Sequence, residues 1–408
     1  METESTLHPH KSGKSFLTRS YDFLAGFHLA TVLLLILLVL TWLATLEQID
    51  QGLHYTLNKY FSWKSPYILP TINGKIVPVL LPGGYYVCAL LLLNMILGGV
   101  VRIRKTPRQI GNLISHFGII FMLIAGGVAH HFEIRGNMAI GEGETSDVAE
   151  DYTEYVIEVA EVIDGQRETF HVIRGTFLSD LQKGKNRTFD FPDMPFSLVI
   201  GGYSKNAAPV SVADRAPQKG ELVTDGFYLS EMEPEKEAER NIAGAYGKYV
   251  LKNGETSNPF IISAASFHPF TIQIDERVFT VEMRKRLWPM PFQVKLEKFT
   301  ADFHPGTSRP AEFISDIRRI ENGQESAVRI EMNEPMRYEG LTFFQASYGP
   351  EGAKPGEKMF SIFEIVRNPA DKWPEYSLYI VAAGMLITFL TKLFGHLSAA
   401  ARKRNQHG

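Results

Sequence analysis

Residues 111–131, GNLISHFGIIFMLIAGGVAHH, are the stretch that decides the fold. The stretch is mostly apolar over about 20 residues, the length that an α-helix needs to cross a bilayer. It nevertheless carries His116 near one end and His130 and His131 at the other. Ionisable side chains inside a membrane span are costly and are expected to be functional. The stretch therefore predicts a membrane helix that carries chemistry.

The composition argues against nucleic-acid binding and excludes sites that need two cysteines. The chain has 408 residues, of which 45% are hydrophobic and 21% charged, and its formal net charge is −3. This lack of a basic excess gives no indication of nucleic-acid binding. Cys88 is the only cysteine, so the chain has neither an internal disulfide nor a Cys-x-x-Cys motif.

Three further apolar segments flank this stretch, at 24–46, 84–101 and 376–394. We expect a membrane protein with four transmembrane α-helices and a large extracytoplasmic β-rich domain between the third and the fourth. The expected parts are a cytoplasmic tail at 1–22, a three-helix region at 23–131 with an extracytoplasmic loop at 47–83, the β-rich domain at 132–372, the fourth helix at 375–395 and a cytoplasmic tail at 396–408.

Residues 132–372 have the pattern of β-strands. Apolar and polar residues alternate in runs such as YVIEVAEVI at 155–163, and such alternation is typical of half-buried strands. Two short segments resemble each other, DMPFSLVI at 193–200 and PMPFQVKL at 289–296. This internal similarity favours two related lobes. Residues 204–258, rich in charged residues, glycine and asparagine, are expected to form a surface region between the lobes.

Lysines and arginines near the span ends predict the orientation. The tail at 1–22 has three and the loop at 102–108 has four, and the C-terminal end is also basic. In a four-span topology these segments share one side, which the positive-inside rule assigns to the cytoplasm. Both termini are therefore expected on the cytoplasmic side, with the β-rich domain on the extracytoplasmic side.

His116 and His130 share one face of the third helix, because residues advance by 100° each, and they lie roughly 21 Å apart along it. Ser115 and Gly118 beside His116 allow close helix approach or leave room for a flat cofactor. Neutral imidazole is a strong ligand for haem iron, so His116 is the candidate metal ligand. The alternative is that His116 hydrogen-bonds to another helix or extends to the interface.

His28 is expected at a similar depth in the first span. It either faces His116 as an axial pair or extends to the interface. Of His130 and His131, one is expected to be a ligand or proton relay and the other an interfacial residue. The sequence shows no catalytic triad spacing, phosphate-binding glycine loop or His-Glu-x-x-His motif, so no self-contained active site is indicated.

The sequence resembles the ResB-like family of cytochrome c biogenesis proteins, the smaller membrane partner in the system II haem-attachment machinery. The segments that carry this resemblance are ISHFGIIFMLIAGG at 114–127, HHFEIRGNMAIGEGETSD at 130–147, MNEPMRYEGLTFFQASYGPEG at 332–352 and FEIVRNPADKWPEY at 363–376.

The resemblance implies a subunit of the cytochrome c synthase that exports haem b and presents it for attachment to apocytochrome c. It also implies a CcsA-like membrane partner with a tryptophan-rich haem-handling motif, and a multi-pass location in the bacterial inner membrane with the large domain on the periplasmic or extracytoplasmic side. The family's transmembrane haem ligand falls on His116, and the histidine that follows falls on His130 or His131. The four tryptophans of this chain are scattered, so the partner is expected to be a separate polypeptide.

Two alternatives stay open at this point. A membrane electron-transfer subunit would hold a permanent b-type haem between His28 and His116. A cofactor-free assembly scaffold would use His116 only for packing. In the family, thioether formation would be shared by the whole complex, so the chain alone is not expected to be an enzyme.

Overall fold

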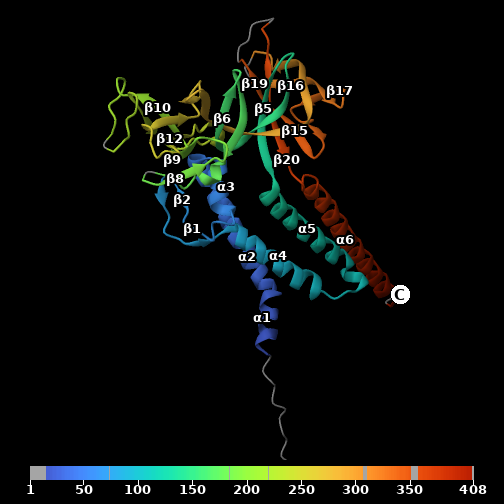
Figure 1. Ribbon diagram of the computed structural model, residues 1–408. Coiled ribbons are helices and arrows are strands. Elements are labelled where there is room, and N and C mark those ends of the chain that lie inside the picture. The colour runs from blue at the N-terminus through green and yellow to red at the C-terminus, as the bar shows by residue number, and fades with distance from the viewer. Residues whose placement is uncertain are drawn as a thin grey trace, which may run out of the picture. The chain divides into compact units, whose positions relative to one another are not determined.

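The computed structural model describes residues 15–72, 74–182, 184–218, 220–306, 310–350 and 357–406. The chain divides into two compact units. One consists of Met1–Phe132 together with Pro369–Gly408, and the other is Glu133–Asn368. The first unit is mainly helical, and the second is built of strands (Figure 1).

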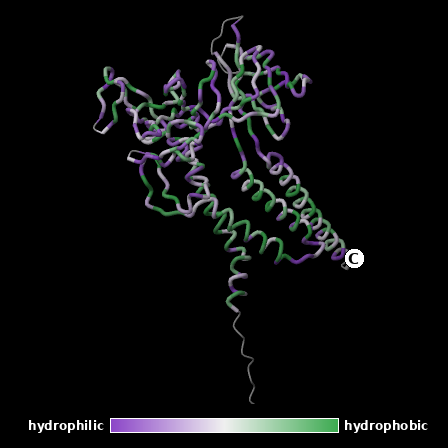
Figure 2. The backbone as a smooth tube through the Cα atoms, in the orientation of Figure 1, coloured by the Kyte–Doolittle hydropathy of each residue, from purple (hydrophilic) through white to green (hydrophobic). Residues whose placement is uncertain are grey.

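Among the described residues, four helices of the first unit are long and apolar enough to cross a membrane. Figure 2 shows their hydrophobic character against the mixed second unit. Four apolar helices with a large β-rich region between the third and the fourth confirm the predicted fold class. The spans are α2 (Phe27–Gln51), α4 (Gly84–Asn94) with its continuation η1 (Met95–Val101), α5 (Ile110–Phe132) after the short η2 (Pro107–Gln109), and α6 (Trp373–Gln406).

Two helices lie in segments that were expected to be tails. α1 (Phe16–Leu24) precedes the first span and is separated from it at Ala25 and Gly26. α6 continues beyond the expected end of the fourth span. Alanines at 399–401 favour the helix, and the basic residues after them are stabilised near a helix C-terminus.

α5 and α6 lie side by side (Figure 1) because small residues let their backbones approach. A Cβ on Gly118 would lie 2.9 Å from a backbone nitrogen of α6, and one on Gly384 would lie 2.5 Å from the Ser115 nitrogen. The Thr388 hydroxyl donates to the Asn112 side-chain oxygen at 3.1 Å. Ser115 and Gly118 therefore serve close helix approach, the first of the two roles considered for them.

The loop between the first two spans is held by a buried carboxylate. Glu47, which is 1% exposed, accepts hydrogen bonds from Lys59 Nζ at 2.5 Å, the Tyr60 hydroxyl at 2.8 Å and the Thr71 amide at 3.0 Å. Burial and this carboxylate raise the pKa of Tyr60 above its usual range. Three donors stabilise the buried charge and fix the loop to the end of α2. The loop contains α3 (Leu53–Phe61), β1 (Tyr67–Ile68), β2 (Thr71–Ile72), β3 (Lys75–Ile76) and β4 (Leu81–Pro82).

The second unit contains one large antiparallel sheet, a four-stranded sheet and a hairpin. The large sheet runs in the order β17 (Gln324–Glu331), β16 (Pro310–Glu321), β15 (Arg277–Phe303), β6 (Thr145–Ile163), β5 (Ile134–Gly141), β20 (Phe360–Arg367), β19 (Leu341–Gly349), β18 (Met336–Tyr338), with β14 (Phe270–Ile274) beside β15 and β7 (Gln166–Ile173) beside β6. The smaller sheet is β13 (Phe260–Ser263), β12 (Gly244–Leu251), β9 (Phe196–Ser204) and β8 (Asn186–Asp190), and the hairpin is β10 (Ala207–Ser211) with β11 (Phe227–Glu231).

Two separate clusters of buried apolar side chains lie in this unit. One contains Phe196 and Phe279, and the other contains Phe292 and Phe343. The strands β6 and β15 pair along much of their length, and β15 contributes to both clusters. The two similar segments at 193–200 and 289–296 thus place their phenylalanines, Phe196 and Phe292, in different clusters.

The expectation of a surface region at 204–258 is wrong for β12. This strand pairs with β9 from Gly244–Ser204 to Leu251–Phe196, and Ala245 is fully buried. Its glycines, which suggested a loop, are needed for packing. A Cβ on Gly247 would lie 2.7 Å from the Phe260 ring.

The contact between α5 and α6 can be tested with two glycines of the same helix. Gly384→Val places side-chain atoms against backbone that cannot move aside, so we expect it to destabilise the protein by about 3 kcal/mol. A Cβ on Gly395 meets nothing within 4 Å, so Gly395→Val is the matched control. Thermal unfolding of the purified protein in detergent, followed by circular dichroism, measures both. Equal stability of the two variants would contradict the close approach.

Candidate functional site

The second span changes from an α-helix to a π-helix in its C-terminal part, from Met95 to Val101. The Arg102 amide donates to the Leu97 carbonyl at 2.9 Å, which is the i→i−5 spacing of a π-helix. π-Helical turns are rare and occur frequently at functional sites. The segment contains two adjacent glycines, Gly98 and Gly99, and each contacts a different neighbour.

Gly98 and Asn94 hold the break between α1 and α2. A Cβ on Gly98 would lie 2.7 Å from the Ala25 carbonyl oxygen. The Asn94 amide donates to the Leu24 carbonyl at 2.6 Å and to the Gly26 carbonyl at 3.0 Å. The last carbonyls of a helix lack helical partners, so this side chain pairs the Leu24 carbonyl at the end of α1 and adds a second donor to the Gly26 carbonyl at the start of α2.

His116 lies on α5 and packs its imidazole against Gly99. A Cβ on Gly99 would lie 3.0 Å from Cγ of His116, so a larger residue at this position requires the ring to shift. The His116 side chain is partly buried, and its Nδ1 is fully buried without a hydrogen-bond partner among the described residues. An unpartnered buried polar atom costs about 1–3 kcal/mol. The fold therefore leaves this ring nitrogen without an internal partner.

At the other end of α5, His130 and His131 meet Tyr85 of α4. The Tyr85 hydroxyl and His131 Nε2 are 3.0 Å apart. The ring centroids of Tyr85 and His130 are 5.7 Å apart, and those of the two histidines are 5.0 Å apart. The structure thus brings both predicted histidines together with a tyrosine that sequence analysis missed. The available signal was that Tyr85 begins a span antiparallel to α5, at the depth where α5 ends.

Between these two positions α5 carries Gly126 and Gly127. A Cβ built on either glycine meets nothing within 4 Å, whereas those on Gly111 and Gly118 would collide with α6. Leu123, on the same face as His116, packs against the cluster formed by α2 and α4. The face between the histidines is therefore apolar and partly unfilled, which suits a flat apolar group.

His28 is not brought to this site. It is exposed on α2, and its ring lies edge-on to its neighbour Phe27 with centroids 6.5 Å apart. Among the described residues, no ring contact joins His28 to His116. The ligand role of His28 therefore stays a prediction.

Within the described ranges, no group of three or more histidine, cysteine, aspartate or glutamate side chains could hold a bare metal ion. A single imidazole such as that of His116 suits a metal that arrives with its own macrocycle, as haem iron does. The apolar face of α5 around Leu123 suits such a macrocycle.

A comparison with protein-family models matches the ResB-like family over residues 104–177 and 238–370. The matched part contains His116, His130 and His131. It leaves out the first two spans, with His28, Tyr85 and the π segment, and also residues 178–237 of the β-rich unit. No curated protein sequence matches the chain at a significant level.

The packing of His116 on Gly99 predicts a strong energetic coupling between the two residues. Gly99→Val should destabilise the protein by about 1–3 kcal/mol, because its side chain must displace the imidazole. In a His116→Ala background the same change should cost much less, because the space is then free. Unfolding free energies of the two single variants and the double variant measure this coupling. Strictly additive costs would show that the two side chains do not compete for one space.

Proposed function

The chain belongs to the ResB-like family, which indicates a role in cytochrome c biogenesis, and from this premise we propose that it is the haem-handling subunit of a cytochrome c synthase. In this role it receives haem b within the membrane, passes it outward and presents it for attachment to apocytochrome c. Haem is the cargo of this process, and the chain supplies its binding positions.

The observation that carries the proposal is the environment of His116. A histidine kept only for packing would have its buried nitrogen paired, as most buried polar groups do. Nδ1 of His116 is buried and has no hydrogen-bond partner among the described residues, and the face of α5 that carries His116 continues with apolar residues such as Leu123. An imidazole there offers one strong ligand to haem iron, and the apolar side chains around it receive the porphyrin.

The two ends of α5 would hold haem in succession. His116 and His130 are separated by roughly 21 Å along the helix, which is too far for both to ligate one iron. His116 would therefore bind haem on the inner side. His130 or His131 would receive it on the outer side, where the Tyr85 hydroxyl orients the His131 ring.

The remaining steps need partners. We propose a CcsA-like membrane protein with a tryptophan-rich motif as the partner that presents haem, and apocytochrome c as the acceptor. Glu133–Asn368 would face the periplasm and guide one or both of them.

Of the alternatives, the electron-transfer subunit requires an axial pair between His28 and His116, for which the described contacts give no support. The cofactor-free scaffold is tested by the second experiment below.

The proposed orientation predicts the outcome of reporter fusions in a bacterial host. Alkaline phosphatase folds into its active form only on the periplasmic side. Fused after Gly136 it should be active, and fused after Lys105 it should be inactive, because basic residues near span ends stay in the cytoplasm. Enzyme activity per amount of fusion protein is the measurement. The reverse pattern would overturn the proposed direction of haem movement.

The role of His116 predicts rescue by a small molecule. His116→Gly should lower the haem content of the purified protein several-fold without unfolding α5, because no backbone hydrogen bond is removed. Millimolar imidazole should restore part of that haem, because it can occupy the vacated space and ligate iron. Haem per protein from the visible spectrum, together with maturation of a cytochrome c reporter in cells, measures the effect.

The matched control is the double variant His130→Ala, His131→Ala at the outer end. It should keep the haem bound at His116 and lose reporter maturation. Wild-type haem content in His116→Gly without imidazole would end the ligand assignment. Loss of protein that imidazole does not restore would favour the scaffold.

A further inference from the structure

A groove of about 840 Å³ lies on the β-rich unit. It is lined by the end of β7, by the one-turn helix η3 (Gly175–Phe177) and by β8 with the residue after it. Residues 187–190 line it from β8 and residues 171–173 from β7, in both cases without a gap. Successive side chains of a strand point to opposite faces of its sheet. A strand that lines a groove with consecutive residues therefore presents its edge to that groove.

Both strands have a free edge. Within the described residues, β8 pairs only with β9, and β7 pairs only with β6. The backbone of residues 187–190 makes no hydrogen bond to the described chain outside its ladder with β9. In an antiparallel strand every second residue directs its N–H and C=O away from its partner. The edge of β8 is thus a template on which another extended chain can pair.

The two faces of β8 differ in polarity. Phe189 pairs with Leu198 and packs against the buried apolar cluster of its sheet, and Phe191 packs against the same cluster. Thr188 and Asp190 point to the other face and are exposed. A strand added beside β8 would continue both faces, because directly opposed residues of two strands lie on one face. It would carry apolar side chains beside Phe189 and polar ones beside Asp190.

The charge of the groove favours a basic partner. Arg187 donates to Asp180 at 2.8 Å, so this pair is neutral. Asp190 accepts a hydrogen bond from the uncharged Ser197 hydroxyl and pairs with no cation among the described residues. The carboxylates of the groove thus exceed its guanidinium by one negative charge. A lysine or arginine opposite Asp190 would form a cross-strand ion pair.

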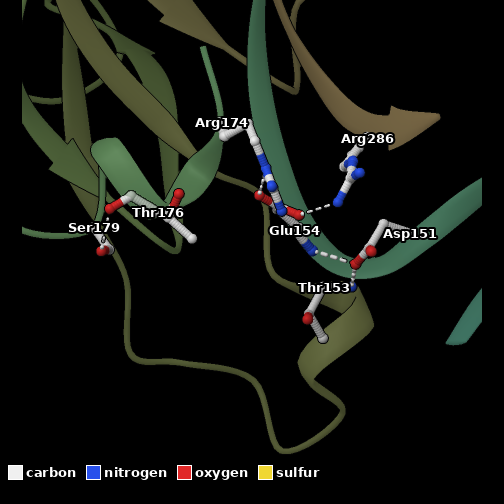
Figure 3. A network of polar contacts seen from close by, with 7 residues as sticks. All are labelled: Asp151, Thr153, Glu154, Arg174, Thr176, Ser179 and Arg286. Atoms are coloured by element: carbon white, nitrogen blue, oxygen red, sulfur yellow. Dashed lines mark hydrogen bonds and ion pairs between the residues drawn. The ribbon is translucent and has the colours of Figure 1, made fainter. Parts of the chain in front are cut away.

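The groove is ordered before a partner arrives. Arg187 donates to the Phe177 carbonyl, which ties β8 to η3. Arg174, at the start of η3, donates to Glu154 of β6 at 3.4 Å (Figure 3). Phe177 is 55% exposed and offers an apolar contact beside the strand edge. Prior ordering of these groups lowers the entropy cost of binding.

We propose that the free edge of β8 binds an extended segment of the acceptor apocytochrome c, which becomes a further strand beside β8. The proposal rests on the proposed function and adds to it the surface that holds the acceptor. Main-chain hydrogen bonds supply affinity in this mode of binding, and alternate side chains supply preference. An acceptor must keep its attachment residues exposed to haem, and pairing through the backbone of a neighbouring segment leaves them free. At about 3.3 Å per residue, β8 holds roughly five residues of the segment.

The experiment measures binding of a short fluorescent peptide of alternating valine and lysine to the purified full-length chain in detergent, by fluorescence anisotropy. Asp190→Asn should weaken binding about threefold, because one cross-strand ion pair is lost while the hydrogen bond to Ser197 can remain. Asp214→Asn is the matched control, because Asp214 is exposed in a turn of the same unit and does not line the groove. Thr176→Trp fills the groove from its exposed η3 wall and should weaken binding about tenfold or more.

The backbone of the peptide gives a test that needs no variant of the chain. In a strand of alternating valine and lysine, the valine N–H groups point to one edge and the lysine N–H groups to the other. Only one of these edges can pair with β8 while the valines face Phe189. N-methylation of one residue type should therefore abolish binding, and N-methylation of the other should preserve it. Equal binding of the two methylated peptides would overturn the strand pairing.

The identity of the partner is tested by competition. Unlabelled apocytochrome c, with its attachment cysteines replaced by serine, should displace the peptide. Failure to displace it, or equally tight binding of a valine–glutamate peptide, would overturn the assignment. So would a dimer of this chain that Thr176→Trp separates, because the groove would then hold a second copy. Failure of the proposed function gives a different result, unchanged haem content in His116→Gly.

Discussion

The close contact between α5 and α6 is the constraint on which the membrane unit depends. Helices in lipid gain little from burying apolar side chains against each other, so tight van der Waals packing must hold them together. Gly111, Ser115 and Gly118 of α5 meet Gly384 and its neighbours on α6 at backbone distance. A stripe of small residues on one side of α5 fixes the rotation of this helix about its axis. Every other side chain of α5 takes its direction from that rotation.

The rotation decides what His116 can contact. The residue after Ser115 lies about 100° further round the helix, so it turns away from α6 and towards η1. There the π segment places two consecutive glycines against two neighbours, Gly98 at Ala25 and Gly99 at His116. One local departure from α-helical geometry thus serves both the break before α2 and the imidazole. This explains why the span tolerates a π segment that has poorer backbone propensity than a continuous α-helix.

The spans and the strand-rich unit could be predicted from the sequence, because apolar length and alternation are averages over many residues. The π segment could not, since the sequence MILGGVV does not distinguish a π-helix from an α-helix and the i→i−5 hydrogen bond from Arg102 to Leu97 is seen only in the folded chain. The pairing of Tyr85 with His131 depends on two spans meeting at one depth. β12 was mistaken for surface because its glycines suggest a loop, whereas Gly247 makes room for the Phe260 ring.

The histidines of this chain differ in whether the fold already satisfies them. His131 shares a hydrogen bond with the Tyr85 hydroxyl, so its ring is oriented by the protein itself. Among the described residues, His116 and His171 each bury one ring nitrogen without a hydrogen-bond partner. Each such atom costs the folded state about 1–3 kcal/mol, and a serine, threonine or asparagine placed nearby could have removed that cost. In the proposed function, His116 is left without an internal partner because its imidazole serves a ligand that comes from outside the chain.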